Sequence, residues 1–279
     1  MRLSKRLTAV ACLFLSRLCF AQAQGVVVQG TVDEIAAQLQ QMCGCRVTFE
    51  SPKYEFPGDL EDQTLQVRRD LWKYPQGSAP KVIAVRRNVL SLNVNQVNGA
   101  AETGNFEVEL NQLIDANNRS PAGAHFQVQK DADGFYILPT EVRHIDGQWG
   151  AAIPILDTRI SIPMERRTAL EMITLIGEGV SLRTGIKGGL MTGPLNGLAN
   201  ISGTWGAKDE AARSVLQRVL SDVHLRTGSI LGWVVGYVPA PEAFGLNITA
   251  VPQLSSSSVA VPAAPAGTAG IAIGGQRAK

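Results

Sequence analysis

Apolar residues recur at helical spacing in several segments of the chain, and each of these segments adjoins a strand-like one. The first segment opens with a capping box, in which Thr31 can accept from the amide of Glu34 and Glu34 can reach back. Gly44 stands where a helix often ends in a left-handed residue. Residues 46–50 then alternate like a half-buried strand. The helical stripe consists of Val32, Ile35, Ala36, Leu39 and Met42.

Two further helices are each predicted to precede a β-hairpin. Asn105 is a suitable N-cap for the first of them, and the strands 124–128 and 135–138 flank a turn at 131–134. Asp209 and Glu210 begin the second helix, whose apolar stripe is continuous. The segments 230–238 and 243–251 follow it on either side of a Pro-Ala-Pro-Glu turn.

A remaining segment begins with a strand at 158–162, and Pro163 marks the entry to a helix that contains Ala169 and Ile176. Gly185 closes this helix before an extended segment, as Gly44 closes the first one. The glycine-rich run 185–194 lacks the G-x-x-x-x-G-K-[ST] signature of a phosphate-binding loop, and the sequence after it does not indicate a helix. We therefore expect a flexible loop there.

These units predict an α+β fold, with repeated helix plus β-hairpin units that form two small sheet-and-helix domains. We place the first domain at 24–148 and the second at 149–252, because the run Gly147-Gln148-Trp149-Gly150 divides the pattern.

The two ends of the chain have a different character. Residues 1–23 resemble a secretory signal peptide, with basic residues first, an apolar run at 7–20 and Ala21-Gln22-Ala23 as the cleavage site. Residues 253–279 are rich in Ser, Ala, Pro and Gly and are expected to form a disordered tail. We predict a periplasmic or secreted protein whose mature chain does not span a membrane.

The formal net charge of +2 is too small for a nucleic-acid-binding surface, so we expect no nucleic acid as a partner. Cleavage at Ala23 would leave Cys43 and Cys45 as the cysteines of the mature chain. A structural zinc needs more ligands than these two supply, and a redox pair usually lies at a helix start. A local disulfide and two partly buried thiols remain as alternatives, and export favours the disulfide.

The acidic segment 50–62 does not fit a calcium loop, and its aromatic residues suggest a loop fixed by packing. We predict that it forms a contact surface for a partner together with LWKYP at 71–75. The proposed contact residues are Tyr54, Glu55, Phe56, Asp59, Asp62 and Trp72.

A resemblance to a known family rests on two runs, TVDEIAAQLQQMCGCRVTFE at 31–50 and ISIPMERRTALEMITLIGEGVSLRTGIKGG at 160–189. Both are similar to the short N-terminal domain shared by secretins and TonB-dependent receptors, in which an amphipathic helix, a glycine and a strand follow one another. The resemblance implies a periplasmic α+β module that contacts other envelope proteins. It brings no catalytic residues.

The favoured hypothesis is therefore an exported, non-enzymatic interaction module with no metal or cofactor and with an envelope protein as its partner. The alternative is a secreted hydrolase-like enzyme that uses His125 or His144 with carboxylates of the 50–62 loop. None of the three histidines lies in a hydrolase signature. The alternative requires a histidine to lie within about 10 Å of such an acid, and much closer for direct proton transfer.

Overall fold

A computed structural model describes residues 24–252, apart from 76–77, 98–99, 102 and 132–133. The predicted signal peptide at 1–23 and the predicted tail at 253–279 lie outside the described residues. The fold combines helices and strands in several sheets, so the α+β prediction is confirmed. No helix within the described ranges is both long enough and apolar enough to cross a membrane.

The helices and strands fall into two series with the same order, apart from β6 and an insertion at 51–89 in the first series and α5 in the second. Those of the first series are β1 (Gln24–Gly30), α1 (Val32–Cys43), β2 (Arg46–Glu50), β5 (Leu90–Val97), β6 (Ala100–Ala101), α3 (Thr103–Asn118), β7 (Ala124–Asp131) and β8 (Gly134–Arg143). Between the series lie β9 (Trp149–Ala151) and a short 3-10 turn, η3 (Ile155–Asp157). Those of the second series are β10 (Arg159–Thr168), α4 (Ala169–Thr184), β11 (Lys187–Thr192), α5 (Leu195–Asn200), β12 (Ser202–Ala211), α6 (Ala212–Thr227), β13 (Leu231–Pro239) and β14 (Glu242–Ala250).

Strand pairing is also the same in the two series. β1 pairs with β5 and β10 with β12 as antiparallel ribbons. β2 pairs with β8 and β11 with β14 in parallel. The hairpins β7–β8 and β13–β14 complete the correspondence. We call residues 24–143 the first unit and residues 159–250 the second unit.

Local signals set the ends of α1 and α4. The amide of Thr31 donates to the Glu34 carboxylate at 2.9 Å, and the amide of Thr168 donates to Glu171 at 2.7 Å. The helices end at Gly44 and Gly185, whose φ angles of 59° and 73° are left-handed. Both glycine ends were predicted and are confirmed.

Other helix starts differ from the prediction. Pro163 does not open α4, because β10 runs through it to Thr168. The β10–β12 ladder is irregular between Ile162 and Glu165, so the missing N–H of Pro163 breaks no regular pair. α3 begins at Thr103, before Asn105. Asp209 and Glu210 lie within β12, which ends at Ala211, and α6 begins at Ala212.

The glycine-rich run is not a flexible loop, since it forms β11 and leads into α5. Its glycines allow close packing. A Cβ on Gly177 of α4 would lie 2.9 Å from the Cα of Gly189, and a Cβ on Gly188 would lie 2.4 Å from the ring of Phe244. Sequence pattern alone could not distinguish this packing from mobility, because both require glycine.

One sheet crosses the predicted domain boundary. Its strand order is β11-β14-β13-β2-β8-β7, with β9 pairing β8 at the side. The seam between the units is the parallel pairing of β13 with β2, where Val234 is opposite Phe49 and Val235 is opposite Glu50. The chain therefore forms two units, but the units share one sheet rather than having one sheet each.

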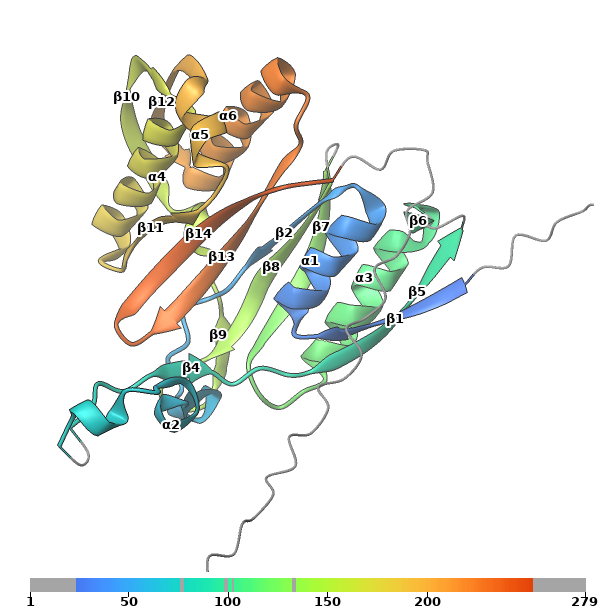
Figure 1. Cartoon of the computed structure of the whole chain (residues 1–279), viewed down its shortest axis with the longest axis vertical. Helices are drawn as coiled ribbons and strands as arrows, with labels where there is room; N and C mark the ends of the chain where they lie inside the picture. Colours follow the sequence, from blue (N-terminus) through green and yellow to red (C-terminus); the bar gives the residue numbers. More distant parts are fainter. Residues whose placement is uncertain (1–23, 76–77, 98–99, 102, 132–133, 253–279) are drawn as a thin grey trace, which may run out of the picture.

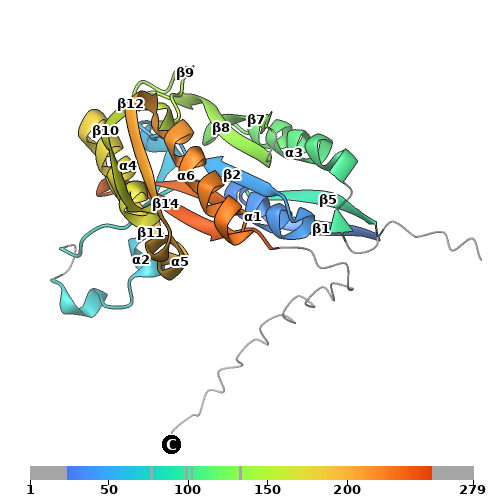
Figure 2. The ribbon, with the colours of Figure 1, turned by 90° about the horizontal axis from the view of Figure 1, so that it is seen from above.

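The two units place their helices on opposite faces of this sheet. In β8, Phe135 and Ile137 belong to the core that contains α1 and α3, whereas Tyr136 and Leu138 belong to the core that contains α4 and α6. Successive side chains of a strand point to opposite faces, so the two cores lie on opposite sides. Figure 1 shows α4 and α6 apart from α1 and α3, and Figure 2 shows α4 and α3 toward opposite ends of the molecule. All five residues of β2 are consequently buried, contrary to the half-buried strand expected.

Each unit has three layers. In the second unit, Gly177 of α4 faces β11, while a Cβ on Gly179 would lie 3.2 Å from Ile160 of β10. Residues two apart lie on nearly opposite sides of a helix, so α4 lies between the large sheet and the β10–β12 ribbon. In the first unit, Val28 and Leu92 of the β1–β5 ribbon share a core with Phe49 and α1.

Candidate interaction arm

The units differ most in the segment that connects β2 to β5 in the first unit and β11 to β12 in the second. In the second unit it contains α5, whereas in the first unit residues 51–89 form a long insertion, which we call the arm. The arm contains η1 (Pro57–Asp59), β3 (Leu60–Asp62), α2 (Thr64–Val67), η2 (Leu71–Lys73) and β4 (Ile83–Val85). Figure 1 shows it projecting beside the tip of the β13–β14 hairpin. It includes all six predicted contact residues.

Asp59 attaches the base of the arm to the first unit. Its side chain is fully buried, and its carboxylate accepts from Arg143 of β8 through both oxygens. Oδ1 also accepts from the amide of Gly123 at 2.8 Å, and the Asp59 carbonyl accepts from the amide of Arg86 at 2.7 Å. The Arg143 guanidinium lies 4.4 Å from the ring centre of Phe56. Asp59 is thus a structural anchor, because its acceptor atoms are occupied by the protein itself.

Tyr54 and Lys53 connect the base of the arm to the second unit. The Tyr54 ring is buried with its centre 6.3 Å from that of Tyr237 in β13, and burial raises the pKa of the Tyr54 hydroxyl. Burial, followed by the charge of Glu242, raises the pKa of Tyr237 to about 12. Lys53 pairs with Glu242 at 2.8 Å, and this contact raises the pKa of the Lys53 ammonium. The base therefore contacts both units.

Polar contacts hold the outer part of the arm in shape. The Asp62 carboxylate accepts from the Thr64 hydroxyl and from the Thr64 amide, and these bonds lower the pKa of Asp62. The Thr64 hydroxyl accepts in turn from the amide of Val82 at 2.8 Å. Arg68 pairs with Asp70 at 3.0 Å and donates to the Tyr74 hydroxyl at 2.9 Å. The arm is therefore an ordered projection with its own hydrogen-bond network.

The arm exposes large apolar side chains. Leu65 is 82% exposed and Trp72 is 81% exposed, which is unusual for side chains of this size. A cavity of about 580 Å³ opens beside Leu65. Its lining residues are Asp62, Thr64, Leu65, Leu71, Tyr74, Pro75, Ala79 and Lys81.

The structure divides the predicted contact residues into two sets. Glu55, Asp62 and Trp72 are exposed and Phe56 is half-buried, whereas Tyr54 and Asp59 are buried and belong to the attachment of the arm. Leu71 and Tyr74 belong to the predicted LWKYP segment, whereas the exposed Leu65 and Val67 were not predicted. The signal for them was present, since TLQVRRDLWKYP at 64–75 carries large apolar residues without helical or strand periodicity.

The structure brings one histidine to the 50–62 loop. The Nδ1 atom of His144 lies 3.4 Å from a carboxylate oxygen of Glu55, and both side chains are exposed. This distance meets the requirement of the hydrolase alternative. His125 instead pairs at 2.8 Å with Glu141 of β8 and stacks on Trp149 at 3.9 Å between ring centres. No cluster of three or more potential metal ligands occurs in the part of the chain that the structure describes.

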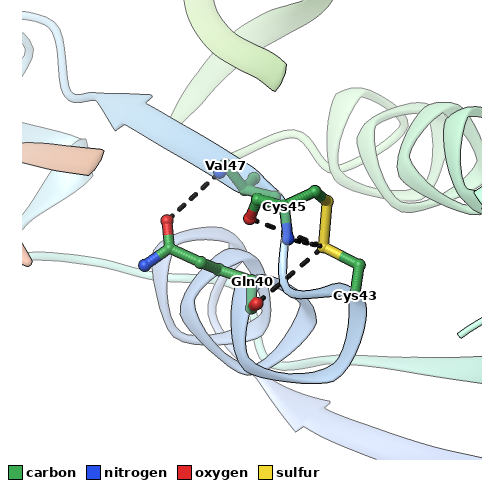
Figure 3. The surroundings of a disulfide bond; sticks show 4 residues. All are labelled: Gln40, Cys43, Cys45 and Val47. Atoms are coloured by element: carbon green, nitrogen blue, oxygen red, sulfur yellow. Dashed lines mark hydrogen bonds between the residues drawn. A yellow bond between two sulfur atoms is a disulfide. The ribbon is translucent and has the colours of Figure 1, made fainter. Parts of the chain in front are cut away.

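Cys43 and Cys45 are joined by a disulfide across the end of α1 (Figure 3). The amide of Cys45 donates to the Cys43 sulfur at 3.1 Å, and the side chain of Gln40 accepts from the amide of Val47 at 3.1 Å. The disulfide therefore lies in the tight connection between α1 and β2, away from the arm.

We predict that intact protein incubated with an alkylating reagent gains no label at Cys43 or Cys45 until a reductant is added, as mass measurement would show. Replacing both cysteines by serine should lower the free energy of unfolding by about 1–2 kcal/mol, because so short a loop restricts the unfolded chain little. Label incorporated at these two residues without reductant would contradict the bond.

The chain matches no family model, and neither curated proteins nor solved structures give a significant match. The resemblance to the secretin and TonB-dependent receptor domain stays a prediction.

Proposed function

We propose that this chain is an exported, non-enzymatic interaction module of the cell envelope, similar in role to the short N-terminal domains of secretins and TonB-dependent receptors. The arm provides its main contact surface. The observation that carries the proposal is an apolar hollow lined by Leu65, with the exposed Trp72 on the same arm, whose base is fixed by Asp59. Large exposed apolar side chains around a hollow are characteristic of protein-binding surfaces.

The partner's chemistry follows from the hollow. Leu71, Tyr74 and Pro75 would contact an apolar side chain, while Asp62 and Lys81 in its lining would accept and donate hydrogen bonds to the partner. An aromatic or aliphatic anchor residue of an envelope protein fits this arrangement.

The test uses a photocrosslinking amino acid in place of Trp72 in the full exported chain, with Leu182 as the matched control position. Leu182 is 86% exposed but lies on α4, far along the chain from the arm. We expect a discrete adduct with another envelope protein at position 72, and a yield at least tenfold lower when Leu65→Asp is added. Equal adducts at positions 72 and 182, or none at position 72, would contradict the proposal.

Export of the protein is tested by a separate experiment. Cell fractionation should find the protein outside the cytoplasm, with Gln24 as the first residue of the mature chain. A cytoplasmic protein that retains residues 1–23 would contradict this part.

The contact between His144 and Glu55 favours a second candidate function, a hydrolase-like enzyme that uses this pair for proton transfer. Hydrolysis of ester or peptide substrates that is lost in both His144→Gln and Glu55→Gln would support it. Activity unchanged by both substitutions would exclude this pair as the catalytic group.

A further inference from the structure

The seam between the units shows how this sheet accepts an additional strand. At the seam, the first unit contributes β2 and the second unit contributes β13, which adds in parallel. By the correspondence between the units, the counterpart of β2 in the second unit is β11. Within the described residues, β11 is an edge strand of the sheet, with β14 as its strand neighbour.

The correspondence of β2 and β11 extends to single residues. Gln40 and Ser181 each lie four positions before the glycine that ends the helix, and each uses its side chain to bond the following strand. Gln40 accepts from the amide of Val47 at 3.1 Å, and the Ser181 hydroxyl, which reaches the carbonyl of Gly177 at 2.9 Å, also lies 3.2 Å from the carbonyl of Gly188. Counted from Gly44 and Gly185, the residue that matches Phe49 is therefore Leu190.

Phe49 is the residue at which β13 joins β2, so β11 has the matching position at Leu190. Leu190 is half-buried, and the next residue, Met191, is 69% exposed. We propose that β11 is an acceptor edge that takes one parallel β-strand from a partner protein at Leu190. This inference rests on the proposed function as an interaction module, and it adds a second contact surface to the arm.

The opposite edge of the sheet, β7, is closed by side chains. The amide group of Asn118 both accepts from the N–H and donates to the carbonyl of Phe126, each at 2.9 Å. Asn117 donates to the carbonyl of Ala124 at 2.8 Å. Phe126 lies opposite Pro139, which has no N–H, so these bonds occupy the edge that faces away from β8. A second copy of this chain would have to displace Asn118 before its β7 could add to β11.

The side chains at the seam also argue for a different protein. Glu50, which follows Phe49, is held by Arg213 of α6. The counterpart of Glu50 in β11 is Met191, which follows Leu190. Helices α3 and α6 align when the buried Phe106 is matched with the buried Ala212, so the α3 residue that corresponds to Arg213 is Glu107. A second copy that added its β7 to β11 would thus bring the carboxylate of its Glu107 toward Met191. The occupant that fits is an extended segment with an apolar side chain over Met191.

The test places the photocrosslinking amino acid at Met191 of the full chain, with Leu225 as the control position. Leu225 is 81% exposed and lies on α6. Two variants carry the crosslinker as well: Leu190→Pro removes the N–H that an added strand would use, and Leu190→Val keeps it. Crosslinking at Trp72 and a far-ultraviolet circular dichroism spectrum check that each variant is folded.

We expect an adduct with a different protein at position 191, retained in Leu190→Val and at least tenfold weaker in Leu190→Pro, with the crosslink in an apolar segment of the partner. A dimer of this chain at position 191, or an adduct unaffected by Leu190→Pro, would overturn the inference. No adduct at position 191 while position 72 crosslinks would overturn the inference and leave the proposed function in place. Failure at both positions would overturn both.

Discussion

Arg213→Ala is expected to lower the free energy of unfolding by about 3–5 kcal/mol, as measured by urea denaturation. Glu50 is fully buried in β2, and both of its carboxylate oxygens accept from Arg213, at 2.8 and 2.9 Å. The indole N–H of Trp233 points to the same carboxylate at 3.4 Å. Removing the arginine leaves a buried carboxylate without its cation, which is costly because the surrounding core cannot solvate it.

A double variant separates the effect of the buried charge on stability from the effect of lost packing. Glu50→Gln combined with Arg213→Met removes both charges and keeps similar volumes, so it should be less destabilised than Arg213→Ala. A single Arg213→Ala variant within 1 kcal/mol of the original protein would show that Glu50 is not held as described.

Asp59→Ala should be the second large effect, with a loss of about 3–5 kcal/mol in the free energy of unfolding. The substitution leaves Arg143 without its carboxylate and the amide of Gly123 without its acceptor. Because these contacts fix the base of the arm, we also expect limited proteolysis to cut faster within residues 60–85 than in the original protein.

Asp62→Ala is the matched control, since Asp62 is an exposed carboxylate of the same arm. It should cost less stability than Asp59→Ala, because it removes bonds to Thr64 from an exposed carboxylate rather than a buried anchor. If Asp59→Ala and Asp62→Ala had equal effects on stability and proteolysis, Asp59 would not be the anchor.

Features that depend on neighbouring residues could be predicted from the sequence. The Thr–Glu pairs at 31/34 and 168/171 mark helix starts by short-range hydrogen bonds, although only the first was recognised as such. Gly44, Gly185 and the two hairpins were predicted because turn chemistry is local. The α+β class follows from these elements.

Features that depend on distant residues could not be predicted. The pairing of Phe49 with Val234 joins segments from the two ends of the fold, and no local pattern indicates it. The strand at 158–162 anticipates the start of β10, but the antiparallel pairings β1–β5 and β10–β12 were missed for the same reason, because their partners lie far apart in the sequence. In the arm, Asp59 looked like an exposed acidic residue, since nothing in segment 50–62 reveals its partner Arg143.

The seam also sets the order in which the protein can fold. β2 is made early, but its neighbour β13 and the cation for Glu50 come from residues 231–239 and from Arg213. Most of the chain must therefore be present before β2 can be covered on both sides. Until then the first unit presents an unpaired parallel edge and an unneutralised carboxylate, so the N-terminal half produced alone should self-associate where the whole chain does not.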